Sequence, residues 1–247
     1  MKLPDKTLFL VPVHNEAANV EPLLAEIRAV YGGVPVCFIN DCSSDQTRRV
    51  LRRNDCRYLD LPNNLGVGGA MQAGFRYAFE QGYDYVIRVD GDGQHPPAEC
   101  PALVKRMLVG DVDMVVGSRF LGDGDYRSAW YRQAGIFWLA WTLSAVCRRR
   151  ITDPTSGFQM MNRAVLGYFA NQYPLDYPEP EALALLSRQG YRFCEVGVSF
   201  RARREGRSSI RHWGTMYYLF KVAVALFVDR CRAVDTRFNR SNVEGWI

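Results

Sequence analysis

Short apolar runs alternate with segments of helical periodicity through the first half of this chain, and that alternation limits the folds open to it. Residues 17–31, for example, place Val20, Leu23 and Ile27 on one face of a helix. Strands alternating with helices predict an α/β fold with a mostly parallel central sheet flanked by helices. The strands expected are residues 7–13, 34–40, 56–61, 83–89 and 113–117, and the helices are residues 17–31, 70–81, 97–109 and a segment that Ser43 or Ser44 caps and that ends at Leu51.

Polar side chains follow three of the predicted strands. His14 and Glu16 come after the first strand, Asp41 after the second, and Asp90 and Asp92 after the fourth. Ligands of such sheets bind beyond the carboxyl ends of the strands. The sequence therefore predicts one site at that edge, built from loops that are far apart in the chain.

Residues 89–96 read Val-Asp-Gly-Asp-Gly-Gln-His-Pro and form the most polar of these loops. Asp90, Asp92 and Gln94 alternate with two glycines, which let the backbone turn tightly. Three oxygen ligands can then converge on one point, and hard ligands of this kind suit Mg²⁺ or Mn²⁺. The alternative interpretation is an ordinary Asp- and Gly-rich turn at a strand end.

Charge and cysteine content indicate the partner and the compartment. The net charge of +5 is carried almost wholly by arginine, which binds oxyanions through paired contacts, so a phosphate-rich partner fits and nucleic acid is not required. The seven cysteines are scattered and include no Cys-x-x-Cys pair. This predicts a reduced, cytoplasmic protein without a zinc site. Residues 1–7 are polar and lack the apolar core of a signal peptide.

Two apolar stretches, residues 135–147 and 213–228, have a composition between those of core and membrane helices. Both are shorter than the roughly 20 apolar residues that span a bilayer, and Lys221 interrupts the second. Three arginines at 148–150 follow the first. Each stretch can form a core helix or lie in a membrane interface, and we expect peripheral association with the inner face of the plasma membrane.

Seven motifs occur in the order of a known family. They are VPVHNEAANV (11–20), NDCSSDQT (40–47), NNLGVGGAMQAG (63–74), VDGDGQHPP (89–97), GSRF (117–120), DPTSGF (153–158) and GRSS (206–209). In these residues the chain resembles family 2 glycosyltransferases of the GT-A fold, close to the dolichyl-phosphate-mannose-synthase-like branch. The resemblance implies a Rossmann-like catalytic domain over residues 1–210. An apolar or amphipathic helix over 211–234 and a polar tail over 235–247 would follow it.

The resemblance also implies a nucleotide-diphosphate sugar as donor, a divalent metal, and inversion at the anomeric carbon. The residues that would contact the nucleotide sugar are Pro12, His14, Glu16, Asp41, Asp90 and Arg119, the last through a donor or acceptor phosphate. The metal ligands would be Asp90, Asp92 and Gln94, with Asp92 also counted as catalytic.

The chain departs from the family pattern in three places, the third of them the stretch 177–181. Cys42 stands where the family usually has glycine, and His14 where it often has tyrosine. Glu179 and Glu181 occupy the place of a Glu-Asp pair that contains the general base, and Glu179 lies at the usual position of the base. The alternative for both glutamates is a solvated helix start, where acidic residues favour the helix dipole. We expect His95 and His212 to be structural.

The basic residues 201–207 are predicted to order over a diphosphate or a lipid phosphate. The residues of this loop expected to bind are Arg201, Arg203, Arg207 and Ser208. A solvated charged face is the alternative.

The function that these observations favour is metal-dependent, inverting transfer of a sugar from a UDP-, GDP- or dTDP-linked donor to a lipid-linked or glycan acceptor in cell-surface glycan synthesis. One alternative is a polyprenyl-phosphate glycosyl synthase that makes mannosyl or glucosyl lipids. Another is a non-catalytic protein that binds sugar nucleotides. The sequence leaves the sugar, the base, the acceptor and the oligomeric state open.

Overall fold

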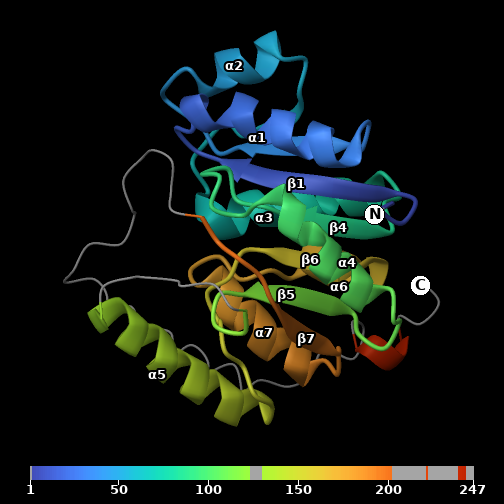
Figure 1. Cartoon of the computed structure of the whole chain (residues 1–247), viewed down its shortest axis with the longest axis vertical. Coiled ribbons are helices and arrows are strands. Elements are labelled where there is room, and N and C mark those ends of the chain that lie inside the picture. The colour runs from blue at the N-terminus through green and yellow to red at the C-terminus, as the bar shows by residue number, and fades with distance from the viewer. Residues whose placement is uncertain (1, 123–129, 202–220, 222–238, 243–247) are drawn as a thin grey trace.

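A seven-stranded sheet forms the centre of the protein (Figure 1). The computed structural model describes residues 2–122, 130–201, 221 and 239–242. The strands are β1 (Thr7–Val13), β2 (Val36–Asn40), β3 (Arg57–Asp60), β4 (Tyr85–Arg88), β5 (Met114–Ser118), β6 (Gln159–Asn162) and β7 (Phe193–Gly197). Their order is β3-β2-β1-β4-β6-β5-β7, and every pairing is parallel except those of β6. The predicted α/β class with a mostly parallel sheet is confirmed.

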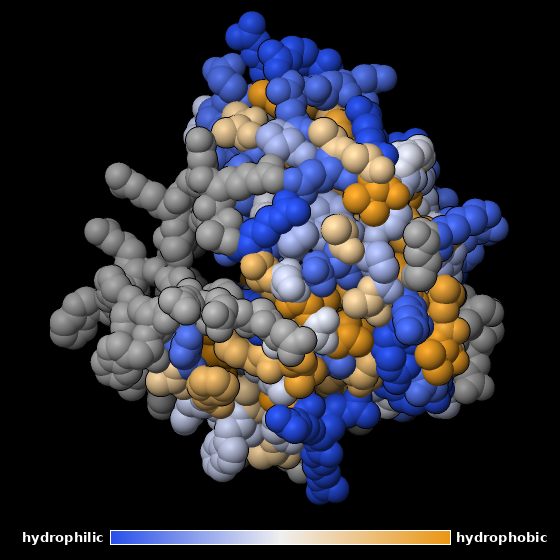
Figure 2. Space-filling model, in the orientation of Figure 1, coloured by the Kyte–Doolittle hydropathy of each residue, from blue (hydrophilic) through white to orange (hydrophobic). Residues whose placement is uncertain are grey.

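Helices cover both faces of the sheet and enclose two apolar cores. The helices are α1 (Ala17–Tyr31), α2 (Thr47–Arg53), α3 (Gly66–Glu80), the 3₁₀ turn η1 (Pro97–Glu99), α4 (Cys100–Met107), α5 (Trp130–Cys147), α6 (Arg163–Asn171), α7 (Pro178–Arg188) and the 3₁₀ turn η3 (Arg240–Asn242). One core joins α3, α5, α6 and α7, and the other joins α1, α2 and α4. Hydrophilic side chains dominate the part of the surface over α1 and α2 (Figure 2).

The helix α3 begins earlier than its sequence predicts. The pattern indicates a glycine-rich turn followed by a helix from residue 70, whereas α3 starts at Gly66. Close packing explains the glycines, because a Cβ atom at Gly68 would lie 2.4 Å from the carbonyl oxygen of Pro174. Glycine is unfavourable inside a helix by about 1 kcal/mol, so tertiary contact outweighs local propensity here.

The loop before α2 is held differently from the expected serine cap. The backbone N–H of Thr47 donates to Asp45 Oδ1 at 2.8 Å, and that of Ala17 donates to Asp45 Oδ2. The predicted cap by Ser43 or Ser44 is therefore wrong, and Asp45 supplies the acceptor. Cys42 has a φ of 53°, in the left-handed region that favours glycine, which accounts for the family's usual residue there.

The reversed strand β6 brings a later part of the chain to the edge where the parallel strands end. It runs antiparallel to both β4 and β5, so its first residue, Gln159, pairs with Arg88 at the end of β4. The turn over residues 153–158 therefore lies at the carboxyl edge of the sheet. The helix α6, which follows β6, is not predicted from the sequence pattern.

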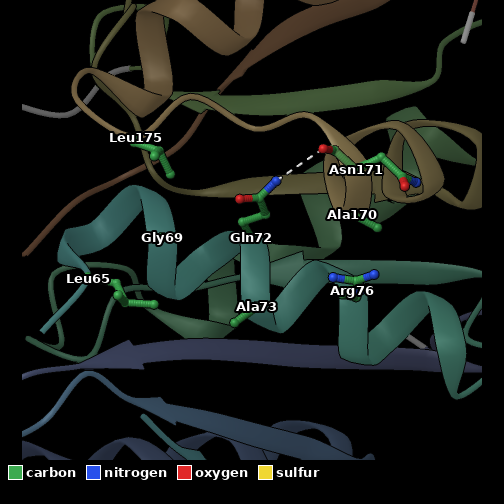
Figure 3. Close-up of a pocket in the computed structure, with 8 residues that line it drawn as sticks. All are labelled: Leu65, Gly69, Gln72, Ala73, Arg76, Ala170, Asn171 and Leu175. Atoms are coloured by element: carbon green, nitrogen blue, oxygen red, sulfur yellow. Dashed lines mark hydrogen bonds between the residues drawn. The ribbon is translucent and has the colours of Figure 1, made fainter. Parts of the chain in front are cut away.

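A surface groove of about 570 Å³ separates α3 from the end of α6 (Figure 3). Gln72 reaches across it and donates to the carbonyl oxygen of Asn171 at 3.3 Å. None of its lining residues is a carboxylate, so the groove does not match the acidic site that the sequence predicts.

The last described residues pack near the beginning of β5, at the end of that strand opposite the carboxyl edge of the sheet. Arg240 donates through Nε to the buried carboxylate of Asp113 at 2.7 Å, just before β5 begins. Apart from Lys221, the helix expected over 211–234 lies outside the described residues, as does most of the tail. Within the described part of the chain, no helix has the length and hydropathy needed to cross a membrane.

Candidate active site

Residues 89–96, which follow β4 and are called the acidic loop below, lie against the end of β1. A Cβ atom at Gly91 would come within 2.8 Å of the Pro12 carbonyl oxygen and 2.6 Å of Val13, so only glycine allows this approach. Asp92 is buried, and its Oδ1 accepts from the backbone N–H of Gln94 at 3.0 Å. Because β2 and β4 flank β1 on opposite sides, this contact lies at the point where strand order reverses, where ligands of open α/β sheets bind.

The residues predicted to hold the nucleotide gather at the ends of β1 and β2. Asp41 is buried and accepts from the backbone N–H of Leu65 at 2.7 Å, which ties the start of α3 to β2. His14 Nδ1 lies 2.7 Å from the carbonyl oxygen of Asp41. With the proton on Nδ1, the ring donates to that oxygen and its Nε2 accepts from Asn15 at 3.1 Å. The Glu16 carboxylate accepts from Asn19 in the first turn of α1.

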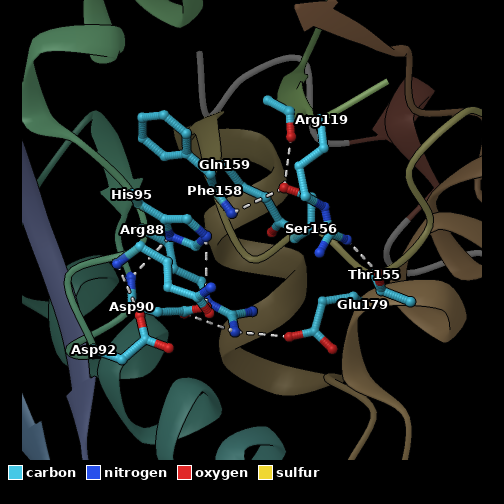
Figure 4. Close-up of polar contacts among 12 residues, drawn as sticks. Arg88, Asp90, Asp92, His95, Arg119, Thr155, Ser156, Phe158, Gln159 and Glu179 are labelled. Carbon is cyan, nitrogen blue, oxygen red and sulfur yellow. Dashed lines mark hydrogen bonds and ion pairs between the residues drawn. The ribbon is translucent and has the colours of Figure 1, made fainter. Parts of the chain in front are cut away.

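A buried arginine joins the acidic loop to α7 (Figure 4). Arg88 Nη2 donates to Glu179 Oε1 at 2.7 Å and to Asp90 Oδ1 at 3.3 Å, and Nη1 donates to the Tyr173 hydroxyl at 3.3 Å. Burial alone lowers the pKa of Arg88, but the charges of Asp90 and Glu179 outweigh it and raise the pKa above its usual value. Arg88 is therefore a fixed cation between two predicted site carboxylates.

Gly157 of the 153–158 turn closes over this ion pair. A Cβ atom at this position would lie 2.7 Å from Asp90 Oδ2 and 2.9 Å from Arg88 Nη2. The motif glycine thus leaves room for the Asp90 and Arg88 side chains. The sequence singles out neither Arg88 nor the reason for Gly157. A lone charge inside an otherwise apolar strand is the signal that points to Arg88.

His95 supports the acidic loop from the apolar side. Its Nδ1 accepts from the backbone N–H of Asp90 at 3.0 Å, and its ring stacks on Phe158 with 5.1 Å between centroids. Burial lowers the pKa of His95, against the opposing effect of Asp90 and Asp92, so the neutral imidazole is favoured. This geometry matches the structural role expected for His95.

Arg119 lies at the end of β5 and pairs with the turn before β6. Its Nε donates to Asp153 Oδ2 at 2.7 Å and its Nη2 to Asp153 Oδ1 at 2.5 Å and to the Thr155 hydroxyl at 2.6 Å. The guanidinium also lies 5.4 Å from the ring centroid of Phe200. These contacts hold Arg119 at the same edge as the acidic loop, where its predicted contact with a phosphate remains a prediction.

The beginning of the basic loop is joined to the proposed metal ligands. The backbone N–H of Arg201 donates to the Gln94 carbonyl oxygen at 3.0 Å, while its side chain pairs with Glu26 of α1 at 2.9 Å. The other predicted loop residues, Arg203, Arg207 and Ser208, lie outside the described residues.

The side chains of the two glutamates of α7 leave the helix in different directions. Glu179 and Glu181 are two residues apart in one helix, which places them about 200° apart around its axis. Glu179 faces Arg88 and the acidic loop, and its second oxygen points away from Arg88 (Figure 4). The geometry therefore brings Glu179, rather than Glu181, to the cluster.

The oxygen-bearing side chains of the acidic loop fit a hard divalent cation. Within the described residues, no group of three His, Cys, Asp or Glu side chains forms a metal cluster. Asp90 and Asp92 supply two carboxylates on one glycine-rich turn, and Gln94, two residues further along, carries an amide that donates to the Arg201 carbonyl oxygen at 3.5 Å. Two carboxylates suit Mg²⁺ or Mn²⁺, which commonly complete their coordination with water and substrate phosphates.

Comparisons with known proteins agree with this fold. A sequence profile described as glycosyl transferase family 2 matches residues 9–169. An undecaprenyl-phosphate mannosyltransferase of Micrococcus luteus is 27% identical over 208 residues, which cover 82% of this chain and 79% of the relative. A polyprenol monophosphomannose synthase of Mycolicibacterium smegmatis is 25% identical, over 93% of this chain and 91% of the relative.

Solved structures give the same architecture. The structure of glucosyl-3-phosphoglycerate synthase from Mycobacterium tuberculosis, in complex with Mn²⁺, UDP-glucose and phosphoglyceric acid, is similar with a TM-score of 0.67. The sequence identity is 21%, and the match covers 93% of this chain and 81% of the other. The expected GT-A fold is confirmed.

Proposed function

Because this chain belongs to glycosyl transferase family 2, we propose that it transfers a sugar from a nucleoside-diphosphate donor to a polyprenyl phosphate, with inversion and with a divalent metal. Family membership makes the chain a glycosyltransferase, so the alternative of a non-catalytic binding protein is set aside. The observation that carries the proposal is that the loop of Asp90 and Asp92 packs, through Gly91, against the end of β1 at the strand-order switch.

The donor would lie across the carboxyl ends of β1, β2 and β4. Pro12, His14, Glu16 and Asp41 would hold the base and the ribose. Asp90, Asp92 and Gln94 would hold Mg²⁺ or Mn²⁺, which would neutralise charge on the departing nucleoside diphosphate. The similar Mycobacterium tuberculosis structure contains Mn²⁺ with a UDP-sugar, which supports the choice of cofactor class.

The acceptor would approach from the side of α7 and the 153–158 turn. Inversion requires one in-line displacement, in which the acceptor oxygen forms the new bond to the anomeric carbon as the bond to the diphosphate breaks. Arg119 would contact a phosphate there, and the loop from Arg201 would border the approach. The two relatives are named as enzymes that act on undecaprenyl phosphate and polyprenol, which favours a polyprenyl phosphate, whose oxygen is already ionised and needs no base.

A hydroxyl acceptor is the second candidate. The specific observation in its favour is Glu179, a carboxylate that α7 holds beside the acidic loop. A hydroxyl must lose its proton during transfer, and a positioned carboxylate can accept it.

The direct test is an assay with the purified chain, UDP-, GDP- and dTDP-sugars, and either a polyprenyl phosphate or a free glycan. We expect transfer to the polyprenyl phosphate with one nucleotide class, complete loss on addition of EDTA, and recovery with excess Mn²⁺ or Mg²⁺. Inverted stereochemistry of the product, measured by NMR of the anomeric coupling, checks the mechanism. Transfer to the glycan alone would favour the second candidate, and transfer in EDTA would contradict the role of the metal.

The helix α5 offers a surface for the membrane that carries such an acceptor. One side packs on α7, where Cys147 contacts the Leu183 carbonyl oxygen. The opposite side exposes Phe137, Trp138 and Trp141, which are 55%, 42% and 72% exposed. Phe137 contacts Phe120, the neighbour of Arg119, with 5.4 Å between ring centroids. Exposed tryptophans followed by arginines at 148–150 suit an anionic membrane surface next to the proposed phosphate contact.

Replacing both Trp138 and Trp141 by alanine should weaken binding to vesicles that contain anionic lipid by about tenfold or more. Co-sedimentation with vesicles at low salt measures this. The matched control is the double substitution Leu108→Ala and Val109→Ala, which removes two exposed apolar side chains after α4 and should leave binding unchanged. Equal binding of both variants would contradict the role of α5.

A further inference from the structure

Arg88 lies at a strand position that faces an apolar core, where an apolar residue is the usual choice. Side chains two apart on a strand face the same way, so Arg88 shares the face of Val86, which belongs to the core of α3, α6 and α7. Only 1% of Arg88 is exposed. Burying a charged group costs several kcal/mol unless well-placed partners offset it, and replacing a buried ion pair with apolar residues is often neutral or stabilising. Stability alone is therefore a weak reason for this arginine.

The partners of Arg88 come from three separate parts of the chain. Glu179 is in the first turn of α7, Asp90 is in the loop after β4, and Tyr173 follows α6. A single nitrogen, Nη2, donates to both carboxylates, with the shorter contact of 2.7 Å to Glu179. The planar guanidinium fixes direction as well as distance, so it sets where the Glu179 carboxylate points relative to the acidic loop.

We propose that Arg88 is a positioning residue for sugar transfer, which clamps Glu179 to the Asp90 loop and so presents one orientation of the Glu179 carboxylate to the reacting groups. This inference rests on the proposed function and concerns its second candidate, in which a hydroxyl acceptor, or water in donor hydrolysis, loses its proton to Glu179. Arg88 itself does not touch substrate. It acts through Glu179, while Asp90 is also held through the bond from its backbone N–H to His95.

If Arg88 has this role, its removal affects turnover and metal affinity in different ways. Without Arg88, the Glu179 carboxylate can adopt other rotamers, and loss of a well-oriented group slows the reaction. The same change removes a positive charge beside Asp90, which leaves the loop more negative and favours a bound cation. A role in folding alone would instead weaken both properties together.

The test compares Arg88→Met, Arg88→Lys and Glu179→Gln with the double variant Arg88→Met/Glu179→Gln. With a hydroxyl acceptor or with water, Arg88→Met should lower kcat about 100-fold, because misplacement of a reacting group has effects of that size. Its affinity for Mn²⁺ in the presence of the nucleoside diphosphate should be unchanged or higher. Arg88→Lys keeps the charge without the paired geometry and should be intermediate. The double variant should be within about threefold of Glu179→Gln, since residues that act as a unit are not additive.

The matched control is Arg163→Met. Arg163 is a partly buried arginine that donates to the carbonyl oxygens of Phe79 and Tyr83 and contacts no proposed site carboxylate in the described structure. Its turnover should equal that of the unaltered chain. If Arg88→Met does not fold, Arg88→Lys carries the test.

Three results would overturn the proposal. They are turnover of Arg88→Met within threefold of the unaltered chain, multiplication of the two single effects in the double variant, and joint loss of turnover, metal affinity and thermal stability. Metal-dependent hydrolysis of the donor in water is measured alongside transfer. If the unaltered chain hydrolyses donor but transfers nothing to a polyprenyl phosphate, the proposed function fails while Arg88 can still be judged by hydrolysis.

Discussion

Replacing Asp92 by alanine should lower the rate of sugar transfer by about 1,000-fold or more with the fold retained. Asp92 is a buried carboxylate on the turn proposed to hold the metal, so its loss removes a ligand and a negative charge at the diphosphate. Metal stabilisation of a leaving group contributes several kcal/mol, and each 1.36 kcal/mol corresponds to about a tenfold change in rate. Steady-state assays with saturating metal and donor measure the effect.

Asp92→Asn separates charge from hydrogen bonding. The asparagine oxygen can still accept from the Gln94 backbone N–H, so the turn should keep its shape. We expect both variants to lose the metal-dependent rise in melting temperature that a nucleoside diphosphate produces in the unaltered chain. Asp111→Asn, on an exposed residue paired with Arg106, is the control and should retain both properties. An active Asp92→Asn variant, within threefold of the unaltered chain, would contradict the need for a negative charge at this position.

Replacing Gly157 by alanine should lower turnover about 100-fold, because the new methyl group would displace either the Asp90 carboxylate or the Arg88 guanidinium. The strain of an added methyl group in a packed site should also lower the free energy of unfolding by about 1–3 kcal/mol. Gly157 has no positive φ, so the effect is steric rather than conformational. Enzyme assays and chemical denaturation measure the two effects separately.

Gly33→Ala is the matched control for Gly157→Ala. A Cβ atom at Gly33 meets no other atom within 4 Å, and its φ is not positive, so alanine should be tolerated there. Should Gly157→Ala turn over as fast as Gly33→Ala, the close approach seen at Asp90 would have no bearing on catalysis.

The sequence correctly predicts the helices and strands whose conformation depends mainly on their own residues. The bounds of β1 and α1 match their predictions because apolar spacing and flanking polar residues are clear in both. The start of α3 is mispredicted because Gly66–Gly69 favour a turn locally, while contact with Pro174 requires glycine in the helix. The direction of β6 is also absent from its sequence, since it depends on which strands lie beside it.

The residues of the candidate site also fall into those that the sequence reveals and those that it does not. Polar residues that directly follow strands, such as Asp41 and Asp90, are visible in the sequence because parallel strands end at one edge. Arg88 and Gly157 are missed because their significance lies in partners from distant segments, Glu179 for the first and Asp90 for the second. The roles of all these residues in catalysis stay predictions.

The ion pair between Arg119 and Asp153 has an implication for how proteins of this kind can diversify. It joins two positions 34 residues apart, so the intervening segment, which contains α5, leaves the sheet and returns to it at one place. A segment whose two ends are held together can change in length without moving the strands on either side, provided that the buried face of α5, with Leu139 and Leu143, is kept. Grafting this segment from a relative would then alter the surface proposed to face the membrane, while the edge proposed to bind the donor would stay as it is.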